Sequence, residues 1–167
     1  MIDRETLQKL YQYSYSLTKN NTTAEDLLQT SLEKFIKRSI QVKSESAYLR
    51  TMIRNQFIDD CRRKKVVSFD SIEDHATSLL DETSLESIVI DNKLVEQIFN
   101  SLNAGERETL YLWAIMGFSA SEIAEETQQS RNTVLSRLHR LKQKVNDNFP
   151  EQTITDDSLS KKKQGSI

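Results

Sequence analysis

Residues 117–144, GFSASEIAEETQQSRNTVLSRLHRLKQK, have the pattern of a helix-turn-helix. Ser119 followed three residues later by Glu122 is typical of a capping box, in which each side chain accepts a hydrogen bond from the other residue's backbone. We therefore expect a short helix at 120–127. Gln128 and Gln129 interrupt the pattern. A second helix should follow this polar break.

Ser130 is the expected N-cap of that second helix. Its apolar residues recur at helical spacing and form the expected buried stripe: Val134, Leu138, Leu141 and Val145. On a wheel of 100° per residue, polar side chains lie opposite the stripe or on its flanks. They are Arg131, Asn132, Thr133, Ser136, Arg137, His139 and Arg140. From 130 to 145 the net charge is +5, in a chain whose total is -2.

A cationic helix of this kind fits the major groove of DNA, where arginine reaches guanine and asparagine pairs with adenine. The alternative is a solvated basic helix, because helix-turn-helix shapes also occur in proteins that never bind DNA. The segment alone leaves both interpretations open.

Composition favours an all-α protein, because 29% of the 167 residues are charged and there are only 3 glycines and 1 proline. No run is long and apolar enough to span a bilayer, and the first residues do not resemble a signal peptide, so we expect a cytoplasmic protein. The single cysteine, Cys61, cannot form an internal disulfide, and no Cys/His spacing suits zinc. We expect Cys61 to be buried, and no metal or cofactor.

Charge is distributed in blocks. Residues 34–65 carry a net charge of +7, whereas residues 66–100 carry -7. This alternation indicates two cationic modules joined by an acidic linker, each contacting a polyanion through its own face.

The first module contains three expected helices, at 5–18, from Thr22 to about 38, and from Ala47 to about 65. Thr22 and Glu25 suggest a capping box for the second helix. The third helix ends in four cations. Tyr13 and Tyr15 lie off the apolar stripe of the first helix, and we assign them no role.

In the second half, 66–87 has the pattern of an extended acidic linker, and 85–99 returns to helical spacing. Asn103 and Glu106 are expected to cap the next helix, whose core includes Trp113. The predicted domains are 1–65, the linker 66–87, 88–149, and a disordered tail at 150–167.

Two segments resemble one known family. AEDLLQTSLEKFIKR (24–38) with AYLRTMIRNQFIDDCRRKK (47–65) resembles region two of bacterial sigma factors, especially the extracytoplasmic-function (ECF) group. LNAGERETLYLWAIMGFSASEIAEETQQSRNTVLSRLHRLKQK (102–144) resembles region four. The resemblance implies two small helical domains and a specificity subunit that binds core RNA polymerase and directs it to promoters. It also implies an anti-sigma factor as partner.

The resemblance assigns roles to residues by position. Those matching the surface that docks on the β′ clamp helices are Asp26, Leu27, Gln29 and Glu33. Those matching the region that captures the melted -10 element are Arg50, Arg54, Asn55, Arg62 and Arg63. Those matching the helix that reads the -35 duplex are Arg131, Asn132, Thr133, Ser136, Arg137 and Arg140. The helix containing Trp113 would lie near the β flap, and the acidic linker would thread the polymerase's RNA path.

The sequence departs from the family pattern at four positions. Tyr48 replaces a usual Trp, Thr30 a common Glu, and Leu135 a usual Lys. Gln128 takes a turn position where Gly is frequent. Either the chain bends there without a positive φ, or Gln128 adopts a strained backbone conformation.

Two other function classes stay open beside a sigma factor. One is an autonomous helix-turn-helix regulator that binds duplex operators as a dimer. The other is a helical adaptor whose basic faces bind acidic proteins. An enzyme has no support, because the sequence contains no Ser/His/Asp set with a nucleophile elbow and no glycine-rich phosphate loop.

Overall fold

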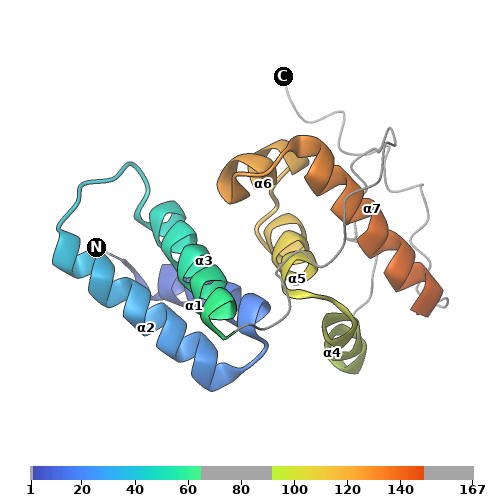
Figure 1. Ribbon diagram of the computed structural model, residues 1–167, viewed down its shortest axis with the longest axis horizontal. Coiled ribbons are helices and arrows are strands. Elements are labelled where there is room, and N and C mark those ends of the chain that lie inside the picture. The colour runs from blue at the N-terminus through green and yellow to red at the C-terminus, as the bar shows by residue number, and fades with distance from the viewer. Residues whose placement is uncertain (1, 65–91, 149–167) are drawn as a thin grey trace. The chain divides into compact units, whose positions relative to one another are not determined.

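The computed structural model describes residues 2–64 and 92–148, and every regular element in these two ranges is a helix (Figure 1). The prediction of an all-α protein is confirmed for this part of the chain. The predicted acidic linker at 66–87 and the predicted C-terminal tail at 150–167 lie outside the described residues. Among the described helices, none combines the length and the apolar character that crossing a bilayer requires.

The chain divides into two compact units. The first contains α1 (Arg4–Thr18), α2 (Asn21–Arg38) and α3 (Glu45–Arg63), together with residues Asn103–Glu108. The second contains α4 (Asn92–Ser101), the π-helical segment η1 (Tyr111–Ile115), α6 (Ala120–Thr127) and α7 (Arg131–Asn148). Helix α5 (Ala104–Leu110) contributes its first residues to the first unit and its last two to the second.

The three helices of the first unit pack against one another around an apolar core. Its side chains are almost fully excluded from solvent: Leu10, Tyr13, Leu17, Ala24, Leu27, Leu49 and Ile53. Leu10 and Leu17 belong to the stripe that the sequence predicts. Tyr13, which lies off that stripe, is nevertheless 1% exposed.

The starts of α1 to α3 are set by side-chain caps. Asp3 Oδ1 accepts a hydrogen bond from Thr6 N at 2.7 Å, and Ser44 Oγ accepts one from Ala47 N at 3.3 Å. The prediction that Thr22 caps α2 is wrong. Asn20, whose backbone is extended, occupies the cap, and its Oδ1 accepts a hydrogen bond from Thr23 N at 2.9 Å. Asparagine is among the best N-cap residues, so the helix begins earlier than a Thr-x-x-Glu pattern predicts.

The second unit has an apolar core where α4 meets α7. Ile98 and Leu102 pack with Leu141 and Val145, and Leu110 and Leu138 lie beside them partly buried. Helix α6 packs on α7, so the helix-turn-helix predicted from the sequence is present. Its first helix has the predicted bounds, Ala120–Thr127.

The segment η1 leads α5 into the helix-turn-helix with a wider helical turn. Met116 N donates to Tyr111 O at 3.1 Å, a bond from residue i+5 to residue i. Gly117 follows with φ +72°, and a Cβ there would meet no atom within 4 Å. Backbone conformation, rather than crowding, therefore favours glycine at this position.

Candidate nucleic-acid interface

The first turn of α7 presents polar side chains to solvent. Arg131 and Asn132 are exposed, and Thr133 is half-buried. Ser130 caps the helix as predicted, because its Oγ accepts a hydrogen bond from Thr133 N at 3.0 Å. Arg131 Nε donates to Ser121 Oγ of α6 at 3.2 Å, so this cation is anchored to the preceding helix.

The capping box at the start of α6 is confirmed. Ser119 Oγ accepts from Glu122 N at 3.2 Å, and Glu122 Oε2 accepts from Ser119 N at 2.8 Å. These hydrogen bonds favour the charged carboxylate and hold the pKa of Glu122 below its ordinary value. The box fixes where α6 begins.

The turn between the two helices contains a residue in the left-handed region. Gln128 has φ 55° and ψ 40°, and Gln129 N donates to Ala124 O at 2.9 Å to close the end of α6. Of the two possibilities that the sequence leaves for this bend, the structure has the strained one. A non-glycine residue in this conformation costs about 1–2 kcal/mol.

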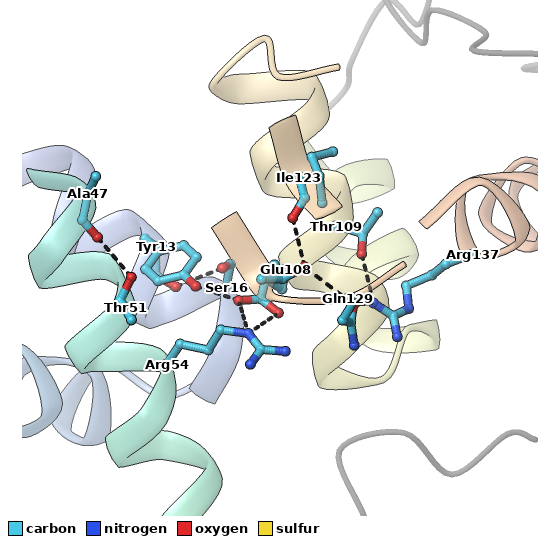
Figure 2. Close-up of polar contacts among 11 residues, drawn as sticks. Tyr13, Ser16, Ala47, Thr51, Arg54, Glu108, Thr109, Ile123, Gln129 and Arg137 are labelled. Carbon is cyan, nitrogen blue, oxygen red and sulfur yellow. Dashed lines mark hydrogen bonds and ion pairs between the residues drawn. The ribbon is translucent and has the colours of Figure 1, made fainter. Parts of the chain in front are cut away.

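The prediction of an exposed Arg137 is wrong. Its side chain is 3% exposed, and its Nη1 donates to Gln129 Oε1 at 2.8 Å and to Thr109 Oγ1 at 3.3 Å (Figure 2). On the helical wheel Arg137 lies next to the apolar stripe, and the buried sector of α7 is wider than that stripe. It also includes Leu135 and Ser136, at 6% and 4% exposed, so the predicted exposure of Ser136 is wrong too. Arg140 is half-buried and His139 exposed.

In the first unit, Arg54 binds the protein's own carboxylate. Its Nε donates to both oxygens of Glu108, at 3.0 and 3.1 Å, and the Glu108 side chain is completely buried (Figure 2). Tyr13 Oη donates a further hydrogen bond to Glu108 Oε1. Arg50 is only 7% exposed. Arg50 is therefore buried and Arg54 half-buried, although both were predicted to lie near the DNA backbone.

The remaining predicted -10 residues are at the surface. Asn55, Arg62 and Arg63 are exposed, the last two at the end of α3. Arg62 Nη1 lies 3.9 Å from Asp59 Oδ1 across one turn, with 78% of the arginine side chain exposed. Such a contact is weak, and it leaves the arginine accessible to a phosphate.

Three of the four predicted docking residues form an exposed row on α2. Asp26, Gln29 and Glu33 are exposed, and Gln29 Nε2 donates to Glu33 Oε1 at 3.1 Å. Leu27, the fourth predicted docking residue, is 5% exposed and belongs to the core, so it does not share the exposed row. Tyr48, which stands in place of a usual Trp, packs its ring against Phe35 with centroids 5.9 Å apart.

No pattern in the sequence indicated the buried charged residues in α5. Asn103 and Glu106 form the expected reciprocal cap, with hydrogen bonds of 2.9 and 3.0 Å. Arg107 then donates from Nε to Ser16 O at 2.7 Å and from Nη2 to Leu17 O at 2.8 Å. Burial lowers the pKa of Arg107. A run of charges following a capping residue is typical of a solvent-exposed helix start. Only the tertiary contacts show that this one is buried.

Cys61 is half-buried, so the expectation of a fully buried thiol is only partly met. Desolvation raises the pKa of Cys61, with a further contribution from Asp60. A raised pKa lowers the fraction of reactive thiolate. Among the described residues no group of three His, Cys, Asp or Glu side chains could hold a metal ion.

Comparison with known families assigns both halves of the chain. Residues 2–66 match Sigma-70 region 2, and residues 92–145 match Sigma-70, region 4. The chain belongs to the sigma-70 family. The two matches follow the order that the resemblance predicts, and together they cover most of the chain.

A relative and a solved structure add to this assignment. The chain is 29% identical over 153 residues to the ECF RNA polymerase sigma factor SigE of Mycolicibacterium smegmatis, and the alignment covers 86% of this chain. It covers only 58% of that sigma factor's length. The fold is similar to the sigma factor RpoE of Bartonella quintana, crystallised in complex with the anti-sigma factor NepR, with a TM-score of 0.61 and 24% identity over 86% of this chain and 91% of that one. The predicted resemblance to the ECF group of sigma factors is confirmed.

Proposed function

We propose that this chain is an alternative sigma factor of the ECF type. It binds core RNA polymerase and directs promoter-specific initiation by capturing the melted -10 element and reading the -35 duplex. The observation that carries the proposal is the succession of two sigma-70 matches, region 2 and then region 4, along one chain. The polymerase supplies the chemistry, and we assign this chain no catalytic residue.

The start of α7 is the proposed -35 reader. Arg131 and Asn132 are exposed side by side in its first turn, with Thr133 next to them. In the major groove arginine recognises guanine and asparagine recognises adenine, while the hydroxyl of Thr133 reaches phosphate or base edges. Arg140, two turns further along, is half-buried and adds a cation on the same helix.

The end of α3 is the proposed -10 module. Asn55 can hydrogen-bond a base edge, and Arg62 and Arg63 are exposed cations for the DNA backbone. A module of this kind must offset the few kcal/mol that each flipped base costs, and contacts to unstacked bases provide that energy.

Two exposed surfaces are proposed to bind polymerase. The row of Asp26, Gln29 and Glu33 on α2 would contact the β′ clamp helices. In η1, Ile115 is 65% exposed and Trp113 half-buried, an apolar surface for the β flap. An anti-sigma factor covering either unit is a further proposed partner, by analogy with the complex named for the Bartonella quintana protein.

Transcription with purified components tests the proposal. Core polymerase with this chain is expected to give run-off transcripts from specific start sites on a genomic template library, and core polymerase without the chain is not. A charge reversal on the docking row, Glu33→Arg, should weaken polymerase binding. The matched control is Glu5→Arg, which makes the same charge change on α1, where the Glu5 side chain is 77% exposed.

Two outcomes would contradict the proposal. One is failure of the wild-type chain to bind core polymerase. The other is tight sequence-specific duplex binding by the free chain with no start-site selectivity in the polymerase assay. The second result would favour an autonomous regulator that binds paired half-sites.

A further inference from the structure

Arg137 lies where three elements of the second unit meet. It projects from the middle of α7, Gln129 belongs to the turn before α7, and Thr109 is the first residue of the second unit in α5. The Arg137 guanidinium donates to side-chain oxygens of both, and Thr109 is completely buried (Figure 2). One side chain therefore joins α7, the turn and α5.

The turn itself depends on support from side chains. Gln128 is in the left-handed region, a backbone conformation that the Cβ of a non-glycine residue disfavours. The next residue, Gln129, receives the Arg137 hydrogen bond at 2.8 Å and a weaker one from Thr127 Oγ1 at 3.4 Å. Because a hydrogen bond with a charged donor is among the stronger ones, Arg137 contributes more to this support than Thr127 does.

The exposed side chains of α7 come directly after this turn. Arg131 and Asn132 are two and three residues beyond Gln129. The orientation of Gln129 therefore sets the direction in which α7 leaves the turn, and with it the position of both groups relative to a DNA groove. A shift of about 1 Å in groups of this kind is enough to misplace their contacts.

We propose that Arg137 is a positioning residue for -35 recognition: it holds the turn through Gln129 and Thr109 and makes no base contact. This inference rests on the proposed function of the chain. A base contact would require the guanidinium to leave its buried acceptors, and the oxygen of Thr109 would then lose a donor in the interior.

The experiment compares -35 binding by holoenzymes that carry single substitutions, on a promoter that the wild-type protein transcribes. Gln129→Met keeps the length of the side chain but removes the acceptor. We expect Arg137→Ala and Gln129→Met each to weaken -35 binding about tenfold, the scale of one charge-assisted hydrogen bond. The double variant should bind no more weakly than the single variant with the larger loss of affinity, because both substitutions remove the same contact.

Base preference separates positioning from direct contact. Arg131→Ala, which removes a proposed base contact, should relax the base preference at one position of the -35 element. Arg137→Ala should weaken binding without changing the base preference at any position, and Arg137→Lys should recover part of the affinity. The thermal unfolding of each variant shows whether it is folded. If Arg137→Ala does not fold, Gln129→Met alone decides the question.

A relaxed base preference at one -35 position for Arg137→Ala, or normal binding by Gln129→Met, would overturn the inference, and the first result would assign Arg137 to the DNA surface. Normal binding by Gln129→Met in a protein whose Arg137→Ala variant does not fold would overturn it as well. Failure of the proposed function is a separate result, because the wild-type holoenzyme would then select no promoter at all.

Discussion

Arg54 and Arg137 have the same expected role in the two units, and in the structure both bind acceptors of the protein itself. Each was assigned to a DNA surface, and each instead donates to oxygens of its own unit. They differ in burial and in their acceptors. The Arg54 side chain is 12% exposed and binds a buried carboxylate, whereas Arg137 is 3% exposed and donates to an amide and a hydroxyl. The comparison shows that a cation on a helix is informative about function only when its acceptors are known.

The largest effect is expected from breaking the Arg54 contact. Arg54→Ala removes the guanidinium that binds the Glu108 carboxylate, which is 0% exposed. We expect the free energy of unfolding of the first unit to fall by about 3–5 kcal/mol, the usual consequence of removing one partner of a buried ion pair. Urea unfolding followed by circular dichroism measures this change.

Arg62→Ala is the matched control for that measurement. Arg62 lies two turns further along α3, and its side chain is 78% exposed beside Asp59. A surface pair contributes about 0–1 kcal/mol, so this variant should unfold almost as the wild type does. Equal losses for the two variants would contradict the assignment of the Arg54 and Glu108 pair to the interior.

A smaller loss of unfolding free energy is expected for Arg137→Met. This substitution keeps apolar volume but removes the donors to Gln129 and Thr109. Neutral acceptors that lose a donor cost about 1–3 kcal/mol, less than an isolated buried charge. Calorimetric unfolding of the second unit measures it. A loss as large as that of Arg54→Ala would mean that the two arginines do not differ in the way their acceptors indicate.

Local signals predicted much of this fold. The bounds of α6 and the caps at Ser119, Ser130 and Asn103 follow from residues within three positions of one another. The hydrogen bonds that form these caps lie within one helical turn, so a short window of sequence is sufficient to predict them. At the start of α2 the Thr-x-x-Glu pattern indicated Thr22 as the cap, whereas Asn20 caps the helix.

The contacts that correct the candidate site join residues far apart in the sequence. Arg54 and Glu108 are separated by 54 positions, and Arg137 and Thr109 by 28. A helical wheel gives the direction of a side chain around its own axis but not the neighbour that covers it. It therefore predicted the exposed Arg131 and Asn132 and failed for Arg137 and Ser136.

Gln128→Gly is expected to raise the free energy of unfolding of the second unit by about 1 kcal/mol or less. Gln128 has φ 55°, which glycine adopts without the clash of a Cβ, although glycine also has more conformational freedom when unfolded. A higher melting temperature of the second unit would agree with this. The same change at Gln129, which is not among the positive-φ residues, should destabilise the unit, because it removes the acceptor of Arg137.

The smallest effect concerns pH. Because the Ser119 hydrogen bonds lower the pKa of Glu122 in the folded state, their contribution is present above the pKa of the unfolded chain and is lost as the pH falls through the folded pKa. In Ser119→Ala, whose Glu122 N loses its acceptor, the carboxyl titration of Glu122 followed by NMR should move up toward its ordinary value of 4.5. The capping substitution itself should cost about 1 kcal/mol. An unmoved titration would show that the box is open in solution, and α6 would then need another explanation for its start at Ala120.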